Sequence, residues 1–112
     1  MAFRALTSAD DLAAALAASH EQPIVLYKHS ATCPLSTRAR RQVQPIAEGA
    51  VPTYEVVVQQ ARPVSNHISS DLGVRHETPQ VLVVHNGTVV FDASHGAVTT
   101  TAVQEALQAA AA

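Results

Sequence analysis

Cysteine is almost absent from this chain of 112 residues, in which Cys33 is the only one. A single thiol cannot form an internal disulfide, so the fold does not rest on disulfide cross-links. This favours a reducing cytoplasm as the location. The thiol is then either a small buried apolar side chain, as free cysteine often is, or a reactive group.

Long apolar runs and a strong charge of either sign are lacking too. The apolar stretches are far shorter than the roughly 20 residues that a membrane span needs. Asp10 and Asp11 interrupt the N-terminus before the apolar part of a secretory signal could form. The formal net charge of −2 gives no basis for binding nucleic acid or an anionic membrane. We therefore expect neither as a partner.

What is present suits one globular unit. The chain is 47% hydrophobic, which is ordinary for a globular protein, and its length allows one core but not two. Residues 1–112 are therefore predicted to form a single domain. Apolar patterning predicts strands at 3–6, 23–28, 53–58, 80–84 and 88–92, and helices at 7–19, 33–44, 62–73 and 100–111.

Capping residues and prolines set the expected helix boundaries. Ser8 is a plausible N-cap that forms a capping box with Asp11. Pro34 suits the first position of its helix, where its missing N–H costs nothing. Pro45 is predicted to kink or end that helix, because it removes an internal hydrogen bond. Gly73 is a C-terminal stop.

The order of elements, β-α-β-α-β-α-β-β-α, predicts the fold class. Strands separated by helices indicate right-handed parallel crossovers. Asn86-Gly87 predicts a type I′ turn, so the last two strands form a hairpin with an antiparallel edge. The expected class is α/β, a small mixed sheet with helices on both faces, which is the order of the thioredoxin fold.

Cys33 is placed where chemistry is expected. It lies between the end of a predicted buried strand and the start of a helix, at the sheet edge where open α/β folds bind ligands. The N–H groups and partial positive charge of a helix start favour the thiolate. They can lower a cysteine pKa from about 8.5 to roughly 3.5–7.5. This position favours the reactive interpretation.

Pro79 supplies a second signal. It directly precedes a strand, about one supersecondary unit after Cys33. In thioredoxin-like folds a cis-proline at this point faces the cysteine, and its neighbours can pair with an extended substrate. We therefore predict a cis Thr78-Pro79 bond, although most X-Pro bonds are trans.

The histidines and arginines have plainer interpretations. His29 and His76 could approach Cys33, but a structural zinc site usually needs four ligands, commonly several cysteines, so no metal is expected. Three arginines of one helix are interpreted as a solvated face. Two others near the thiol end are left open between anion binding and surface charge. The three helical arginines are Arg38, Arg40 and Arg41, and the two near the thiol end are Arg62 and Arg75.

Four segments together resemble one family. They are "KHSATCPLS", "RPVSN", "GVRHETPQVLV" and "HNGTVVFDASH", which occur in this order between about Phe3 and Leu107. The T-C-P-[IL]-S core and the H-E-[ST]-P-Q segment resemble the YtxJ-type monothiol bacilliredoxins, or bacillithiol system redox-active proteins. The resemblance implies a thioredoxin-like fold and a role with bacillithiol, a small thiol that some bacteria use in place of glutathione.

The resemblance also assigns residues. It implies that Cys33 is the reactive cysteine, that Pro79 is the cis-proline and that Ser36 occupies the position of a resolving cysteine. An aromatic residue common in the family is replaced here by Gly96, which puts its contribution to ligand binding in doubt. Supporting or substrate-binding roles are expected for Thr32, Pro34, Ser36, His76, Arg75, Thr78 and Pro79.

The function implied is removal of bacillithiol from protein mixed disulfides through Cys33. Bacillithiol is then a co-substrate, and no bound metal or organic cofactor is expected. The partners are bacillithiolated client proteins and, indirectly, an NADPH-dependent flavin reductase. Two alternatives stay open: a non-catalytic bacillithiol-binding redox sensor, and a glutaredoxin-like carrier of an iron–sulfur cluster.

Overall fold

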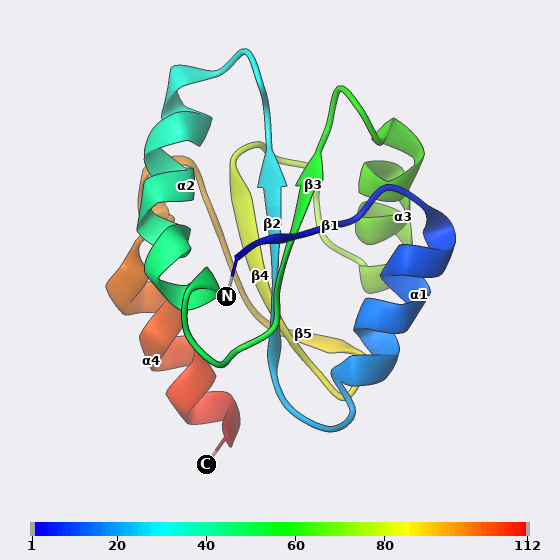
Figure 1. Ribbon diagram of the computed structural model, residues 1–112, viewed down its shortest axis with the longest axis vertical. Coiled ribbons are helices and arrows are strands. Elements are labelled where there is room, and N and C mark those ends of the chain that lie inside the picture. Colours follow the sequence, from blue (N-terminus) through cyan, green and yellow to red (C-terminus); the bar gives the residue numbers. More distant parts are fainter. Residues whose placement is uncertain (1, 112) are drawn as a thin grey trace.

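The computed structural model describes residues 2–111 and has a five-stranded sheet between two layers of helices (Figure 1). Helices α2 and α4 cover one face of the sheet, and α1 and α3 cover the other. The strands are β1 (Arg4–Ala5), β2 (Ile24–His29), β3 (Thr53–Val57), β4 (Gln80–His85) and β5 (Thr88–Ser94). The helices are α1 (Ala9–Ala18), α2 (Pro34–Ala47), α3 (Arg62–Leu72), the 3-10 helix η1 (His95–Ala97) and α4 (Thr100–Ala111).

The sheet confirms the predicted mixed α/β class. Its strand order is β1-β3-β2-β4-β5, with β1, β3 and β2 parallel and both β4 and β5 antiparallel to their neighbours. The hairpin turn has positive φ at Asn86 (55°) and Gly87 (72°), as predicted. The helix η1 was not predicted.

The expectation of parallel crossovers is wrong for the step from β3 to β4. Strand β4 runs antiparallel to β2, with Lys28 opposite Gln80, although α3 separates it from β3. The reason lies in residues 73–79, an irregular segment that returns the chain from the end of α3 to the edge where β2 and β3 finish (Figure 1). Strand β4 therefore begins at the same edge of the sheet at which β2 ends.

Two apolar cores hold the layers together. Alternate residues of each strand face opposite sides of a sheet, so β2 contributes to both cores. Leu26 packs toward α1 and α3, whereas Val25 and Tyr27 pack toward α2 and α4. All three are fully buried. None of the described helices is long and apolar enough to cross a membrane.

The helix caps agree with the sequence in most respects. The Ser8 hydroxyl caps α1 by accepting the Asp11 N–H at 3.1 Å. The Asp11 carboxylate accepts the Thr7 backbone N–H at 2.9 Å, and the Ser8 backbone N–H, which a capping box uses, interacts with it more weakly. Gly73 ends α3 in the left-handed conformation, with φ 68°.

Pro45 does not end α2, contrary to one of the two outcomes predicted for it. The helix continues to Ala47, and Ile46 and Ala47 are both buried. Beyond the proline the helical bonding resumes, because the Glu48 N–H donates to the Gln44 carbonyl at 2.9 Å. Burial of the last turn against the sheet thus offsets the one hydrogen bond that the proline removes.

Candidate functional site

Cys33 lies at the start of α2, where the sequence places it. It is the N-cap residue, with extended backbone, and Pro34 is the first helical residue. Its side chain is partly exposed to solvent. The thiol is therefore open to reaction with a molecule from outside.

The loop between β2 and Cys33 is held from β3's side of the sheet. Gln59, which follows β3, donates from Nε2 to the Ser30 hydroxyl at 2.9 Å, and its Oε1 accepts the Ala31 N–H at 3.0 Å. The Ser30 N–H donates to the buried Ser36 hydroxyl at 3.2 Å. The Gln59 side chain thus fixes the loop that leads to Cys33, and the Ser36 hydroxyl connects this loop to α2.

The first turn of α2 lowers the pKa of the Cys33 thiol. The largest cause is the hydrogen bond from the Ser36 backbone N–H, which partial burial opposes by raising the pKa. The Leu35 N–H and the Ser36 hydroxyl lower the pKa further. These are the unpaired donors of a helix start, which stabilise an anion. The thiolate, which is the nucleophile in disulfide exchange, is favoured.

Iodoacetamide labelling of Cys33 against pH is expected to have a midpoint below that of a free cysteine. A Ser36→Ala variant should raise the midpoint only part of the way, because it loses the hydroxyl donor but keeps the backbone N–H. Mass spectrometry of the labelled protein gives the rates. A wild-type midpoint at the free-thiol value would contradict the stabilised thiolate.

Tyr27 lies beneath the same turn. Its hydroxyl donates to the Ser36 carbonyl at 2.7 Å and also lies 3.1 Å from His29 Nδ1. Since the hydroxyl proton points to Ser36, His29 Nδ1 must carry the proton of the second contact. Burial raises the pKa of the Tyr27 phenol, so the group under the thiol is neutral.

The Thr78–Pro79 bond is cis, as predicted. Pro79 is buried and immediately precedes β4, whose first residue pairs with Lys28 near the end of β2. The Pro79 carbonyl accepts the His95 N–H at 2.9 Å. The proline and the loop that carries Cys33 thus lie at the same edge of the sheet.

Lys28 is the only lysine of the chain, and it is fully buried. Its Nζ lies 2.7 Å from Nδ1 of His76, a partly buried contact just before the cis-proline. Burial lowers the pKa of Lys28 to about 8, and the Glu77 carboxylate opposes that shift. Burial, followed by the charges of Lys28 and Arg62, lowers the pKa of His76. A buried cation without a carboxylate in contact is costly to the fold.

Lys28→Met should therefore raise the free energy of unfolding at pH 7, by on the order of 1–3 kcal/mol. The folded pKa lies below the unfolded value of 10.5, so the cost of the charge to wild type is complete below about pH 8 and fades as pH rises from about 8 toward 10.5. The advantage of the variant should shrink over that window. Urea denaturation at pH 7 and pH 10 measures the stability difference between variant and wild type and its decrease with pH. A variant less stable than wild type at pH 7 would contradict the prediction.

The structure gives different surroundings to the five arginines that the sequence analysis considered. Arg40 is not part of a solvated face, because its Nε lies 2.6 Å from Glu55 and its guanidinium is 4.3 Å from the centre of the Phe3 ring. Its neighbours Arg38 and Arg41 are exposed, as predicted. Arg75 is 91% exposed and lies 3.5 Å from Glu77. Arg62 is exposed at the start of α3.

The structure therefore brings most predicted residues to one edge. Thr32 and Pro34 flank the thiol and are exposed, Ser36 is buried behind it, and Thr78 is half-buried. Sequence reasoning missed the supporting residues Tyr27, Lys28 and Gln59. The first two carried a signal, because they are polar groups at the end of an apolar strand. Among residues 2–111, no three His, Cys, Asp or Glu side chains gather as a metal site would require.

Comparison with known proteins agrees with this geometry. A structure described as having a thioredoxin fold is similar, with a TM-score of 0.84, 30% identity and coverage of 94% of this chain and 93% of that chain. The thioredoxin of Fasciola hepatica is similar in fold, with a TM-score of 0.78, 20% identity and coverage of 96% and 99%. Thioredoxin f from spinach chloroplast is also similar in fold, with a TM-score of 0.77, 18% identity and coverage of 99% of this chain and 95% of that chain.

The family model described as monothiol bacilliredoxin BrxC matches residues 4–103. This confirms the resemblance seen in the four sequence segments. Family and fold together support a thiol-based redox function, that of a thiol oxidoreductase. The chain belongs to the monothiol bacilliredoxin family.

Proposed function

We propose that the protein removes bacillithiol from mixed disulfides on client proteins, with Cys33 as nucleophile. The Cys33 thiolate attacks the bacillithiol sulfur, the client leaves as a thiolate, and Cys33 holds bacillithiol in a disulfide. A second bacillithiol thiolate attacks the bacillithiol sulfur of that disulfide. Cys33 is released as thiolate, and oxidised bacillithiol is the product. Each step exchanges one thiolate for another, so electrons balance without a further oxidant.

One observation carries this proposal. Cys33 is a partly exposed thiol with a lowered pKa, and Ser36 stands at the position from which a second cysteine would resolve the disulfide. The chain has no other cysteine, so the resolving thiol must come from outside. A small external thiol supplies it without a second binding protein.

The edge formed by Thr78 and Pro79 supports client binding. The residues before the proline are not paired with a strand, since β4 begins at Gln80. Their backbone groups can therefore pair with an extended client segment that carries the mixed disulfide. Thr32, Pro34, His76 and Arg75 surround that segment in this proposal.

The remaining parts of the proposal follow from the family. Bacillithiol is the co-substrate, and no resident metal or organic cofactor takes part. Oxidised bacillithiol is returned to its thiol by a separate NADPH-dependent flavin reductase. The exchange is placed in a reducing cytoplasm, where small thiols are kept reduced.

The test is turnover. A bacillithiolated client, in large excess over the protein, is incubated with reduced bacillithiol, and released client thiols are counted by mass spectrometry. Many client molecules reduced per protein molecule supports the enzyme. A protein that takes one bacillithiol adduct and then stops is a sensor, and the proposed activity is refuted.

A further inference from the structure

A small groove separates the first turns of α2 from η1. Its volume is about 80 Å³. Both of its walls begin at the candidate site, because Leu35 is the second residue after Cys33 and the His95 N–H donates to the Pro79 carbonyl. The α2 wall consists of Leu35, Arg38, Ala39 and Gln42, and the opposite wall of His95, Gly96, Val98 and Thr99.

Four of the eight lining residues have polar side chains, and none of the eight is a carboxylate; the four are Arg38, Gln42, His95 and Thr99. Gln42 Oε1 accepts the Thr100 N–H at 3.0 Å, and the Thr100 hydroxyl donates to the Gln42 backbone carbonyl at 2.5 Å. The Gln42 amide N–H groups are therefore left without an acceptor among residues 2–111. Arg38 forms no ion pair within the same residues, since the described ion pairs involve other side chains. Glu77 approaches His95 at 3.5 Å but does not line the groove. Such a lining suits an anion.

We propose that this groove binds the carboxylate end of the low-molecular-weight thiol that is joined to Cys33, with Arg38 as its principal contact. The inference rests on the proposed exchange and adds a site for one part of its co-substrate. A guanidinium and an amide N–H present paired donors, which match the two oxygens of a carboxylate.

The dimensions agree with this assignment. Whole small-molecule pockets usually measure roughly 300–1,000 Å³, so a groove of about 80 Å³ holds only one end of such a ligand. From Cys33 to Arg38 the helix advances about 7.5 Å, at 1.5 Å per residue. Two residues of an extended peptide-like chain span about 7 Å. A thiol of tripeptide size can thus bond to Cys33 and reach Arg38.

Gly96 leaves the opposite wall of the groove open. A Cβ built at Gly96 would meet no atom within 4 Å. The wall therefore contributes no side chain at that position, and no aromatic ring covers the ligand there. The polar contacts left for the small thiol are Arg38 and Gln42 on the α2 wall and His95 and Thr99 on the opposite wall.

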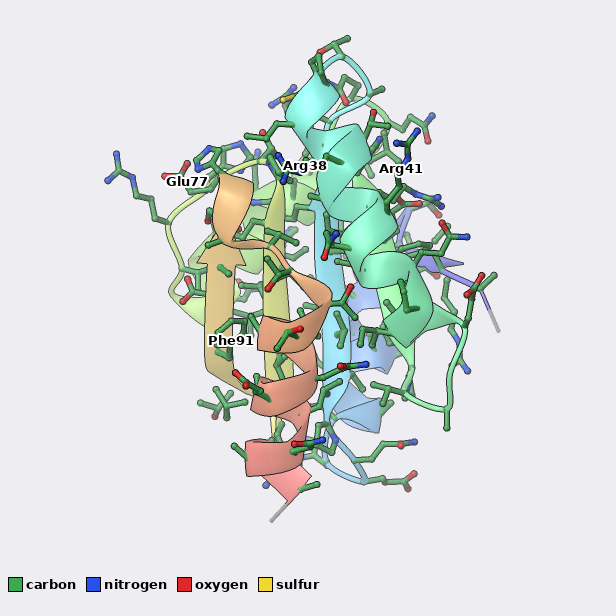
Figure 2. The ribbon with its side chains drawn as sticks, turned by 90° about the vertical axis from the view of Figure 1, so that its left-hand side faces the viewer. Arg38, Arg41, Glu77 and Phe91 are labelled. Atoms are coloured by element: carbon green, nitrogen blue, oxygen red, sulfur yellow. The ribbon has the colours of Figure 1, made fainter. Side chains whose placement is uncertain are left out.

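Arg38→Gln tests the groove, and Arg41→Gln is its matched control. Both arginines are exposed on α2, but Arg38 lies on the side facing η1 and Arg41 on the other side (Figure 2). Cys33 adduct formation is timed by mass spectrometry with three disulfides: oxidised bacillithiol, oxidised glutathione and neutral bis(2-hydroxyethyl) disulfide. Arg38→Gln should slow the reaction about tenfold with the carboxylate-bearing disulfides and leave the neutral one unchanged. Arg41→Gln should change none of them by more than about twofold.

The outcomes separate this site from the proposed activity. A loss with both carboxylate-bearing disulfides supports carboxylate recognition, and a loss with bacillithiol alone supports a groove selective for that thiol. Equal effects of Arg38→Gln and Arg41→Gln, or an equal loss with the neutral disulfide, overturn the proposal. If Arg38→Gln slows adduct formation as expected but wild type never turns over a client, the proposed activity is refuted and the groove proposal is supported.

Discussion

A Cys33→Ala variant should lose all catalysed reduction of a bacillithiolated client. Cys33 is the only thiol of the chain, so no other side chain can take over the attack on the mixed disulfide. The rate should fall to that of reduced bacillithiol and client alone. Counting released client thiols, with and without the variant, measures the loss.

Two controls make this result specific. Ser36→Ala keeps the thiol and should retain most of the activity, which shows that a changed first turn of α2 does not by itself abolish it. The thermal unfolding of Cys33→Ala should stay close to that of wild type, because its sulfur is partly exposed and little apolar burial is lost. If Cys33→Ala reduces the client as fast as wild type, Cys33 is not the nucleophile.

Ser36→Cys should convert the external resolution step to an internal one. The Ser36 hydroxyl is close enough to the Cys33 sulfur to help lower its pKa, so a sulfur at that position is well placed for attack. The new thiol expels bacillithiol from Cys33 and forms an intramolecular disulfide. After treatment with oxidised bacillithiol, wild type should keep one adduct, whereas the variant should lose its adduct and two hydrogens.

The matched control is Ser36→Ala, which should keep the adduct as wild type does. It removes the same hydroxyl contact with the Ser30 N–H, so it reports any effect of a disturbed loop. Persistence of the adduct on the Ser36→Cys variant would show that the buried position 36 cannot reach the Cys33 sulfur.

Local sequence signals predicted the elements of the fold well. Gly73 and Asn86-Gly87 require positive φ, and Pro34 fits only a helix start, so each indicates its structure without help from the rest of the chain. The direction of β4 could not be found this way. It depends on residues 73–79, which have no periodic pattern and whose path is set by contacts with distant segments.

The same limit applies to the candidate site. Cys33 and Pro79 were predicted because each stands next to an element boundary. Gln59 was missed because its role is to bond Ser30, about thirty residues away in the chain, and nothing next to it marks that role. Arg40 was misread as solvated for a similar reason: its partner Glu55 lies on a different element.

The contact between Lys28 and His76 fixes which ring nitrogen of the histidine carries a proton. A charged lysine amine has only donors, so below about pH 8 the 2.7 Å contact requires His76 Nδ1 to accept. The neutral ring must then carry its proton on Nε2. Protonating Nδ1 as well would place two cations in contact. This repulsion is one cause of the lowered pKa of His76. The charged lysine and the lowered pKa of His76 therefore favour the same state, a neutral ring that donates from Nε2.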